Sequence, residues 1–205
     1  MSPLEGDIWR YIRDSGAVNR VKTYYLSGRF TGRRFDRLGG GGDAPEVAHR
    51  FTGDDLVAVS LLSVQIPGQA AINILEDTSV AEGLIEIPCG VDLWNAPIGV
   101  VEPSSAADQI FGRLKGINGV GWVTAHKLLA RKRPQLLPVY DRVVKGMLQP
   151  RSPKFWIPLW ETLQDPAIPE RLKEIRVAAG LDESISLLRV LDVALWMASS
   201  QPNST

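Results

Sequence analysis

The sequence predicts an all-α protein, with a single compact helical domain over residues 1–198 and a disordered tail at 199–205. Three observations support this fold class. Apolar residues recur at the three- and four-residue spacing of amphipathic helices along most of the chain. No segment alternates apolar and polar residues at the period of a β-strand. A length of 205 residues with 44% hydrophobic residues is enough for a sizeable core.

The first half of the chain contains the signals of four helices. Residues 7–26 form one amphipathic stretch, which Gly16 interrupts. Thr52 precedes two acids, as a helix N-cap does, and the apolar run at 56–62 that follows predicts a central buried helix. The two remaining helices are shorter and are expected at residues 67–75 and 78–86.

The second half begins with a glycine- and proline-rich loop at 88–103, and Ser104 or Ser105 caps the helix expected at 106–115. Glycines then lead into a helix that stops before Pro134, and a further helix follows Asp141. After a turn at 150–153, three more helices are expected at residues 155–163, 169–179 and 185–197. The aromatic residues of the first of these three favour a core position over a surface for stacking bases.

The charge of the chain is unevenly distributed. The net charge is zero, which argues against a generic binder of polyanions. Residues 109–160, however, carry ten basic side chains and one acid, Asp141, so this segment has a charge of +9 and the rest of the chain −9. Because salt limits the reach of charge to ~8–10 Å, local sign decides whether a phosphate backbone is attracted.

Several classes of protein are excluded by simple patterns. No apolar run approaches the roughly 18–20 residues of a membrane span, and the N-terminus does not resemble a secretory signal. Cys89 is the only cysteine, so a reducing, cytoplasmic location without membrane partners is expected. His49 and His126 lack partners at metal-ligand spacing, and no metal site is predicted. A phosphate-binding Walker loop is also absent from the sequence.

Residues 28–37 interleave four arginines with two phenylalanines. Aromatic faces between guanidinium groups are typical of proteins that bind splayed nucleotides. The same composition also fits a docked loop with a solvated basic edge, and the sequence leaves both interpretations open.

The most specific pattern lies at residues 114–148. It reads L-x-x-I-x-G-V-G-x-x-T-A over 114–125 and P-V-Y-D-R-V-V over 138–144. This pattern resembles the helix-hairpin-helix element and the following catalytic segment of the DNA glycosylase superfamily. The chain as a whole also resembles a group of uncharacterised actinobacterial proteins, which implies no function.

The resemblance implies a glycosylase-like helical lobe around the hairpin, with the N- and C-terminal helices completing a second wall. It implies that Asp141 is the catalytic carboxylate. The family's lyase-competent members carry a lysine where this chain has Val123, so a monofunctional enzyme that uses water is expected. One cysteine rules out the family's four-cysteine iron-sulfur cluster. No other cofactor is expected, although a potassium or sodium ion on the hairpin carbonyls is compatible with the resemblance.

The expected partner is DNA, bound by amide groups of the hairpin and by basic side chains. The residues expected to bind DNA are Gly119, Gly121, Lys127, Arg131, Lys132 and Arg142. The candidates for the pocket of an extruded base are Tyr24, Phe35, Trp94 and Tyr140.

Other interpretations of the same residues remain open. Asp141 stands where an aspartate caps a helix, and the glycine pair also fits a tight turn between helices. A non-catalytic helix-hairpin-helix protein that binds DNA is therefore the main alternative, and a helical interaction protein is a third. The target base, the choice between DNA and RNA, and the oligomeric state stay open.

Overall fold

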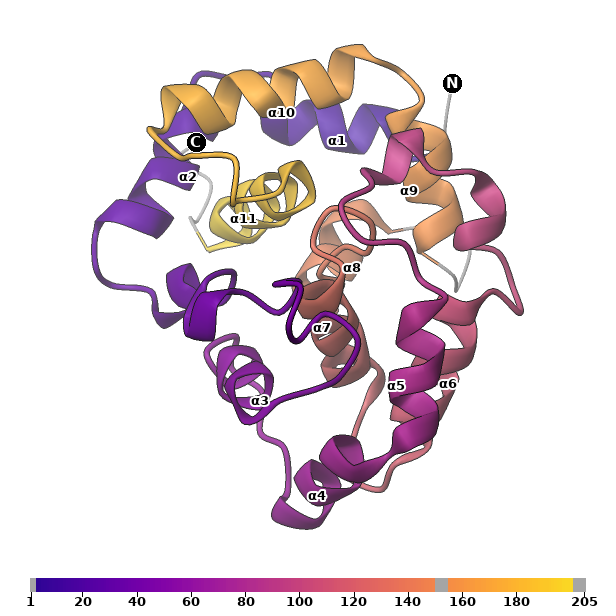
Figure 1. Ribbon diagram of the computed structural model, residues 1–205. Helices are drawn as coiled ribbons and strands as arrows, with labels where there is room; N and C mark the ends of the chain where they lie inside the picture. The colour runs from indigo at the N-terminus through magenta and orange to yellow at the C-terminus, as the bar shows by residue number, and fades with distance from the viewer. Residues whose placement is uncertain (1–2, 150–154, 201–205) are drawn as a thin grey trace. The chain divides into compact units, whose positions relative to one another are not determined.

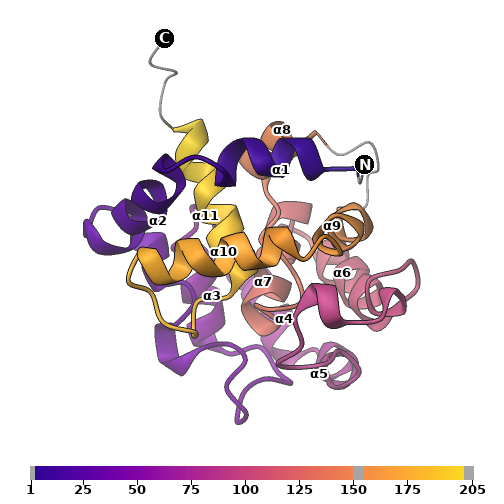
Figure 2. The ribbon, with the colours of Figure 1, turned by 90° about the horizontal axis from the view of Figure 1, so that it is seen from above.

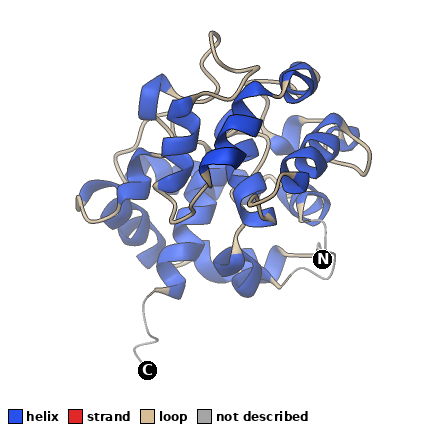
Figure 3. Cartoon of the chain, turned by 90° about the horizontal axis from the view of Figure 1, so that it is seen from below, coloured by secondary structure: helices blue, strands red, loops and turns tan. Residues whose placement is uncertain are grey.

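The computed structural model describes residues 3–149 and 155–200. These residues form eleven α-helices and four short 3-10 helices, and no strand occurs among them (Figure 3), so the all-α prediction is confirmed. The turn predicted at 150–153 and most of the predicted tail lie outside the described residues. Ser199, placed in that tail, is the last residue of a helix. In the described part of the chain, no helix is both long and apolar enough to cross a membrane.

The chain divides into two compact units. Unit 1 combines the two ends of the chain, Met1–Phe30 and Val139–Thr205. Unit 2 is the continuous segment Thr31–Pro138. The single domain expected over residues 1–198 stays a prediction.

Unit 2 is built around one buried helix, α7 (Trp122–Lys132). On one side α7 packs against α3 (Gly53–Ser60), and on the other against α6 (Ala106–Gly116), which packs in turn against α5 (Thr78–Ile85), as Figure 1 shows. A further helix of this unit, α4 (Gly68–Glu76), follows Pro67. All residues from 124 to 132 of α7 are buried. The prediction that residues 56–62 form the central buried helix is wrong, because Val57 of α3 is 52% exposed.

The predicted caps of unit 2 are confirmed. The Thr52 hydroxyl accepts a bond from the Asp55 amide, and the Asp55 carboxylate accepts one from the Thr52 amide, which makes a capping box at the start of α3. Ser105 caps α6 by accepting a bond from the Asp108 amide at 3.2 Å. Local sequence therefore determines where these helices begin.

Unit 1 is built around the apolar C-terminal helix, α11 (Leu187–Ser199). Helices α1 (Glu5–Ile12), α2 (Gly16–Leu26), α8 (Arg142–Leu148) and α10 (Ala167–Ala178) all contact it (Figures 1 and 2). The stretch at 7–26 forms two helices, since residues 13–15 separate α1 from α2. The predicted aromatic helix is α9 (Trp156–Leu163), and Phe155 and Trp156 are buried as predicted for a core position.

His126 of α7 makes the stability of the protein depend on pH. Its ring is buried 4.5 Å from the Phe111 ring, and Nδ1 lies 2.8 Å from the Trp122 carbonyl oxygen. Burial lowers the pKa of His126 from 6.5 to about 4, because the imidazolium loses its hydration. Between these values the unfolded chain binds a proton that the folded chain does not. Stability therefore falls as the pH falls from 6.5 towards 4.

We expect the free energy of unfolding to lose about 2 kcal/mol from this group between pH 7 and pH 5. Urea denaturation of wild type and His126→Gln at the two pH values measures it, since the variant lacks this contribution. Equal pH dependence in wild type and His126→Gln would contradict the prediction.

Candidate functional site

The loop at residues 117–121 joins α6 to α7 in a tight turn. The Ile117 amide donates to the Leu114 carbonyl at 3.1 Å, and the Val120 amide donates to the Ile117 carbonyl at 2.9 Å. Gly119 is exposed with φ +89°, and a Cβ there would lie 2.7 Å from Cγ of Pro67. Both the backbone angle and the proline ring therefore require glycine at this position.

Gly121 leaves the first amide groups of α7 without a side-chain cap. It is exposed, and it is the N-cap residue without a side chain that could cap the helix. A Cβ at this glycine would meet no atom within 4 Å. The first amide groups of an α-helix have no partner inside the helix, and they bind anions where a ligand can approach. Arg113 and Lys115 are exposed basic residues in the last turn of α6, just before the loop.

Three of the six predicted DNA contacts are buried, which corrects the prediction for them. Lys127 is 4% exposed, Arg131 2% and Lys132 0%. The Lys127 ammonium donates to the Leu62 carbonyl at 2.9 Å inside unit 2. A phosphate on the surface cannot reach these groups. Arg142, by contrast, is exposed on α8.

Arg131, Lys132 and Arg133 instead form a buried cation cluster at the C-terminal end of α7. Asp55 is its carboxylate partner, 3.1 Å from Nε of Arg131 and 2.5 Å from Nζ of Lys132. The other donors of the cluster bind backbone carbonyls, which belong to Phe35, Asp36, Leu38, Gly42, Val47, Ala48, Leu84, Ile87 and Lys132. Nη2 of Arg133 also lies 3.4 Å from Nδ1 of His49. The cluster therefore fastens the long loop at 35–48 to the core helix.

The cluster also explains how unit 2 accommodates three buried cations beside one carboxylate. Burial lowers the pKa of Lys132 by desolvation, and the hydrogen bond to Asp55 acts against this shift. Burial lowers the pKa of Arg133 in the same way. Carbonyl dipoles and the negative end of the α7 helix dipole take the place of further carboxylates.

The basic surface is smaller than the sequence suggests. Of the ten basic residues at 109–160, four are buried, namely Lys127, Arg131, Lys132 and Arg133. Two others, Arg151 and Lys154, lie outside the described residues. The exposed ones in the described part of the segment are Arg113, Lys115, Arg142 and Lys145. The high local charge in the sequence therefore overstates the attraction for a phosphate backbone.

Asp141 is the N-cap of α8 in unit 1. Its Oδ1 accepts bonds from the Val143 amide at 2.9 Å and the Val144 amide at 3.1 Å. The residue is partly exposed. The predicted cap is thus confirmed, whereas its catalytic role stays a prediction. A helix N-terminus stabilises the carboxylate anion, as either role requires.

Three of the four candidates for a base pocket are core residues, so the prediction is wrong for them. Phe35 is buried in unit 2. In unit 1, Tyr24 stacks on Phe30 with ring centroids 5.2 Å apart, and Tyr140 stacks on Phe155 at 4.1 Å. Burial raises the pKa of Tyr140 to about 12, as expected for a phenol removed from water. Among the four candidates, only Trp94 is partly exposed.

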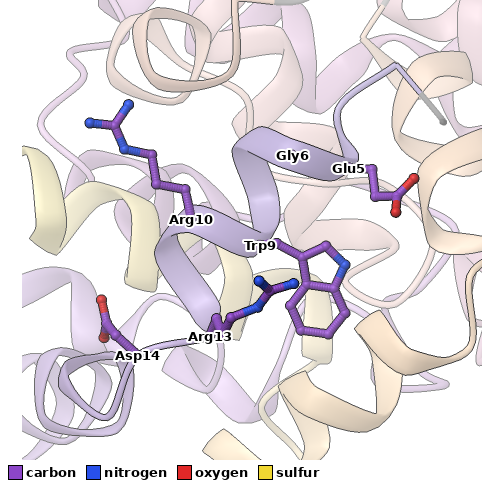
Figure 4. Close-up of a pocket in the computed structure, with 6 residues that line it drawn as sticks. All are labelled: Glu5, Gly6, Trp9, Arg10, Arg13 and Asp14. Carbon is purple, nitrogen blue, oxygen red and sulfur yellow. The ribbon is translucent and has the colours of Figure 1, made fainter.

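Two hollows in the described surface do not coincide with the predicted site. One, of about 520 Å³, lies along α1, where the Arg13 guanidinium sits 5.2 Å from the centre of the Trp9 ring (Figure 4). The other, of about 230 Å³, is lined by residues that include Ile87, Val100 and Ala106. Neither includes Gly119, Gly121 or a candidate for the base pocket.

The described residues around the glycine turn offer backbone carbonyls and no cluster of metal-binding side chains. No group of three histidine, cysteine or acidic residues that could hold a metal occurs within residues 3–149 and 155–200. Leu114 and Ile117 each offer a carbonyl that accepts one bond within the turn. The potassium or sodium ion that the resemblance implies at this turn stays a prediction.

Asp55 and the cation cluster are the features that sequence reasoning missed. Lysine and arginine are rarely buried, so the sequence predicts Arg131 and Lys132 on the surface as contacts to DNA. One signal was present, because Asp55 occupies the third position of a capping box, where its carboxylate is held in one orientation. Apart from the Lys132 carbonyl, the partners that complete the cluster lie 46 or more residues away along the chain and have no signature in the sequence.

The described residues thus define an all-α protein composed of two compact helical units, one continuous and one assembled from both chain ends. Residues 17–199 match the model of a family described as a family of unknown function, DUF6308, and the chain belongs to this family. No curated protein and no solved structure matches the chain. The family description names no activity.

Proposed function

We propose that this protein binds duplex DNA through the loop at 117–121 and acts as a monofunctional DNA glycosylase that uses Asp141. The observation that carries the proposal is the exposed glycine turn, where Gly121 leaves the start of α7 open. The pattern that resembles the glycosylase superfamily runs from this turn to Asp141.

The binding step rests on backbone groups more than on side chains. Amides at the start of α7 would donate to one phosphate, and Lys115 and Arg113 would add attraction in place of the buried Lys127, Arg131 and Lys132. A potassium or sodium ion on the turn carbonyls would supply positive charge next to the same phosphate. Few exposed cations predict modest affinity with a clear dependence on salt.

The chemical step is hydrolysis of an N-glycosidic bond. The bond between C1′ and the base breaks, and the base leaves with the electron pair and takes up a proton. Water adds to C1′ and loses a proton, which balances the one that the base takes up. The Asp141 carboxylate would stabilise the oxocarbenium-like sugar or orient this water, as carboxylates do in glycoside hydrolysis. Val123 offers no amine, so no imine forms and the strand is not cut. Extruding the base costs a few kcal/mol, least for weakened pairs.

A gel assay on labelled duplexes with a panel of damaged and modified bases tests the proposal. Alkali after the reaction cuts every abasic site. We expect alkali-dependent cleavage by wild type on at least one substrate and a loss of at least 100-fold in Asp141→Asn. Asparagine caps helices about as well as aspartate, so this variant removes the charge and keeps the fold.

Asp77→Asn is the matched control, because Asp77 caps α5 with the same kind of bonds to Ser79 and Val80. It should excise as well as wild type. Excision by Asp141→Asn at the wild-type rate would overturn the role of Asp141.

A non-catalytic DNA-binding module is the second candidate function. It is favoured by the position of Asp141. Accepting bonds from the Val143 and Val144 amides is a sufficient structural role for this residue, with no catalytic function required. This candidate predicts salt-dependent binding of duplexes and no abasic product on any substrate. Neither binding nor cleavage would instead favour a helical interaction protein.

A further inference from the structure

The loop at residues 31–38 in unit 2 presents its arginines outward and its aromatic residue inward. It begins with a short 3-10 helix, Thr31–Arg34. Arg33 and Arg34 are exposed, whereas Phe35 is buried in the core of the unit. The other phenylalanine of this region, Phe30, belongs to unit 1 and stacks on Tyr24. The aromatic rings are therefore not available for stacking bases, and the guanidinium groups remain on the surface.

The backbone of this loop is fixed from inside the unit. Arg131 donates to the carbonyls of Phe35, at 2.5 Å, and of Asp36, at 2.8 Å, and also to the Leu38 carbonyl. At the other end of the loop, the Thr31 hydroxyl donates to the Leu61 carbonyl at 3.1 Å. The buried guanidinium of Arg131 thus holds the backbone of the segment that carries the exposed Arg33 and Arg34. A backbone ordered in advance lowers the entropy lost on binding.

Arg33 and Arg34 are suited to phosphate groups. Within the described residues, neither guanidinium takes part in a hydrogen bond or an ion pair. Guanidinium groups form paired hydrogen bonds with phosphate oxygens, and two adjacent ones can follow successive phosphates. An anionic partner would therefore not have to displace a carboxylate of the protein.

The segment at 61–67 places this loop within reach of the glycine turn. Its first residue, Leu61, accepts the bond from Thr31, and its last, Pro67, lies against Gly119 of the turn. Six residue steps span at most ~22 Å, since an extended chain covers ~3.6 Å per residue. One strand of a duplex has a phosphate for each ~3.4 Å of helix axis. Leu61 and Pro67 are therefore separated by no more than the length of about six base pairs, so one duplex can contact both the loop and the turn.

We propose that Arg33 and Arg34 form a second DNA-backbone site of unit 2, which contacts phosphates of the duplex held by the turn at 117–121. This inference rests on the proposed DNA binding and names contacts that the turn alone does not provide. Arg33 and Arg34 supply exposed cations, which Arg131 and Lys132 cannot do because they are buried. Because phosphates carry no sequence information, the site binds duplexes of any sequence.

The test is the salt dependence of binding to a fluorescein-labelled, undamaged 20-base-pair duplex, measured by anisotropy. Each lost phosphate contact lowers the slope of log K against log salt concentration by ~0.9. For Arg33→Ala/Arg34→Ala we expect a slope smaller by about 1.8 and an affinity at ~0.1 M salt lower by at least 10-fold. A duplex of different sequence should give the same changes.

Two further variants separate charge from structure. Lys22→Ala/Lys173→Ala removes two exposed cations of unit 1 and should keep the wild-type slope. Arg33→Lys/Arg34→Lys keeps both charges and should also retain the slope, because the number of neutralised phosphates is unchanged. Unfolding curves of all variants should match that of wild type, since the substituted side chains are exposed.

The outcomes distinguish the inference from the proposed function. If wild type binds with a steep slope and Arg33→Ala/Arg34→Ala gives the same slope and affinity, only the second site is overturned. If Lys22→Ala/Lys173→Ala reduces the slope equally, the contact is diffuse and the second site is again overturned. If wild type binds no duplex at low salt, the proposed DNA binding fails and the inference fails with it.

Discussion

Asp55→Ala is expected to lower the free energy of unfolding by about 3–5 kcal/mol, the usual cost of removing one partner of a buried ion pair. Asp55 is the carboxylate of the cation cluster, within 3.1 Å of both Arg131 and Lys132. Its removal leaves two cations in the core of unit 2 and also destroys the capping box with Thr52. Native domains are stable by only about 5–15 kcal/mol, so this variant should be close to unfolding.

Urea denaturation of wild type, Asp55→Ala and Asp54→Ala measures the effect. Asp54 is the matched control, because it lies in the same helical turn and is exposed. We expect Asp54→Ala to cost less than about 1 kcal/mol. A loss in Asp55→Ala no greater than in the control would show that carbonyl groups alone stabilise the cluster.

A double variant isolates the charge from the cap. Lys132→Met in the Asp55→Ala background removes one of the two cations that lost their carboxylate. Because an uncompensated buried charge is the main cost, the double variant should be more stable than Asp55→Ala alone. If it is less stable, the contribution of Asp55 lies in the cap and in packing.

Asp192→Ala is expected to cost a similar amount, about 3–5 kcal/mol, in unit 1. Arg189 and Asp192 lie on the apolar helix α11, with side chains only 4% and 5% exposed, and they form an ion pair there. The Arg189 guanidinium also donates to the Tyr24 hydroxyl at 2.8 Å and lies 5.3 Å from the centre of the Tyr24 ring. Removing the carboxylate leaves this guanidinium in the core of the unit.

Glu183→Ala is the matched control for this prediction. Glu183 pairs with Arg176 at 3.8 Å, but its side chain is 93% exposed, so its loss should change stability by less than about 1 kcal/mol. The same denaturation experiment compares the two variants. Equal effects would contradict the argument that burial, rather than pairing, determines the cost.

The stability of the cation cluster also bears on the proposed function. Arg131 fixes the loop that carries Arg33 and Arg34, and Asp55 holds Arg131 in place. Arg131 and Lys132, which the sequence predicts as DNA contacts, thus stabilise the interior of unit 2. Arg33 and Arg34 of the loop at 31–38 are exposed cations. Variants of Asp55, Arg131 or Lys132 that lose DNA binding should therefore be interpreted through stability first.

Much of the local structure could be predicted, because its causes are local. Thr52, Ser105 and Asp141 cap helices as their neighbours in sequence indicate. Gly119 adopts the positive φ for which glycine is suited. The helices themselves follow from apolar residues at three- and four-residue spacing. These signals depend on a few consecutive residues, so no knowledge of the tertiary structure is needed.

The candidate site could be predicted only in part. The sequence located the glycine turn and the cap at Asp141, since each is a local pattern. It did not reveal that Tyr24, Phe35 and Tyr140 are core residues, because an aromatic ring suits both a core and a binding pocket. Which of the two it occupies depends on the segments that cover it.

By itself, the sequence determined an all-helical chain, the ends of most helices, and a glycine turn followed by an acid at the start of a helix. Only the tertiary structure decided which helix is central in each unit and which cations reach the surface. The physical reason is that burial depends on distant partners. Carbonyls of the loop at 35–48 and the carboxylate of Asp55 compensate the charges of Arg131 and Lys132, and they come from segments more than 70 residues away.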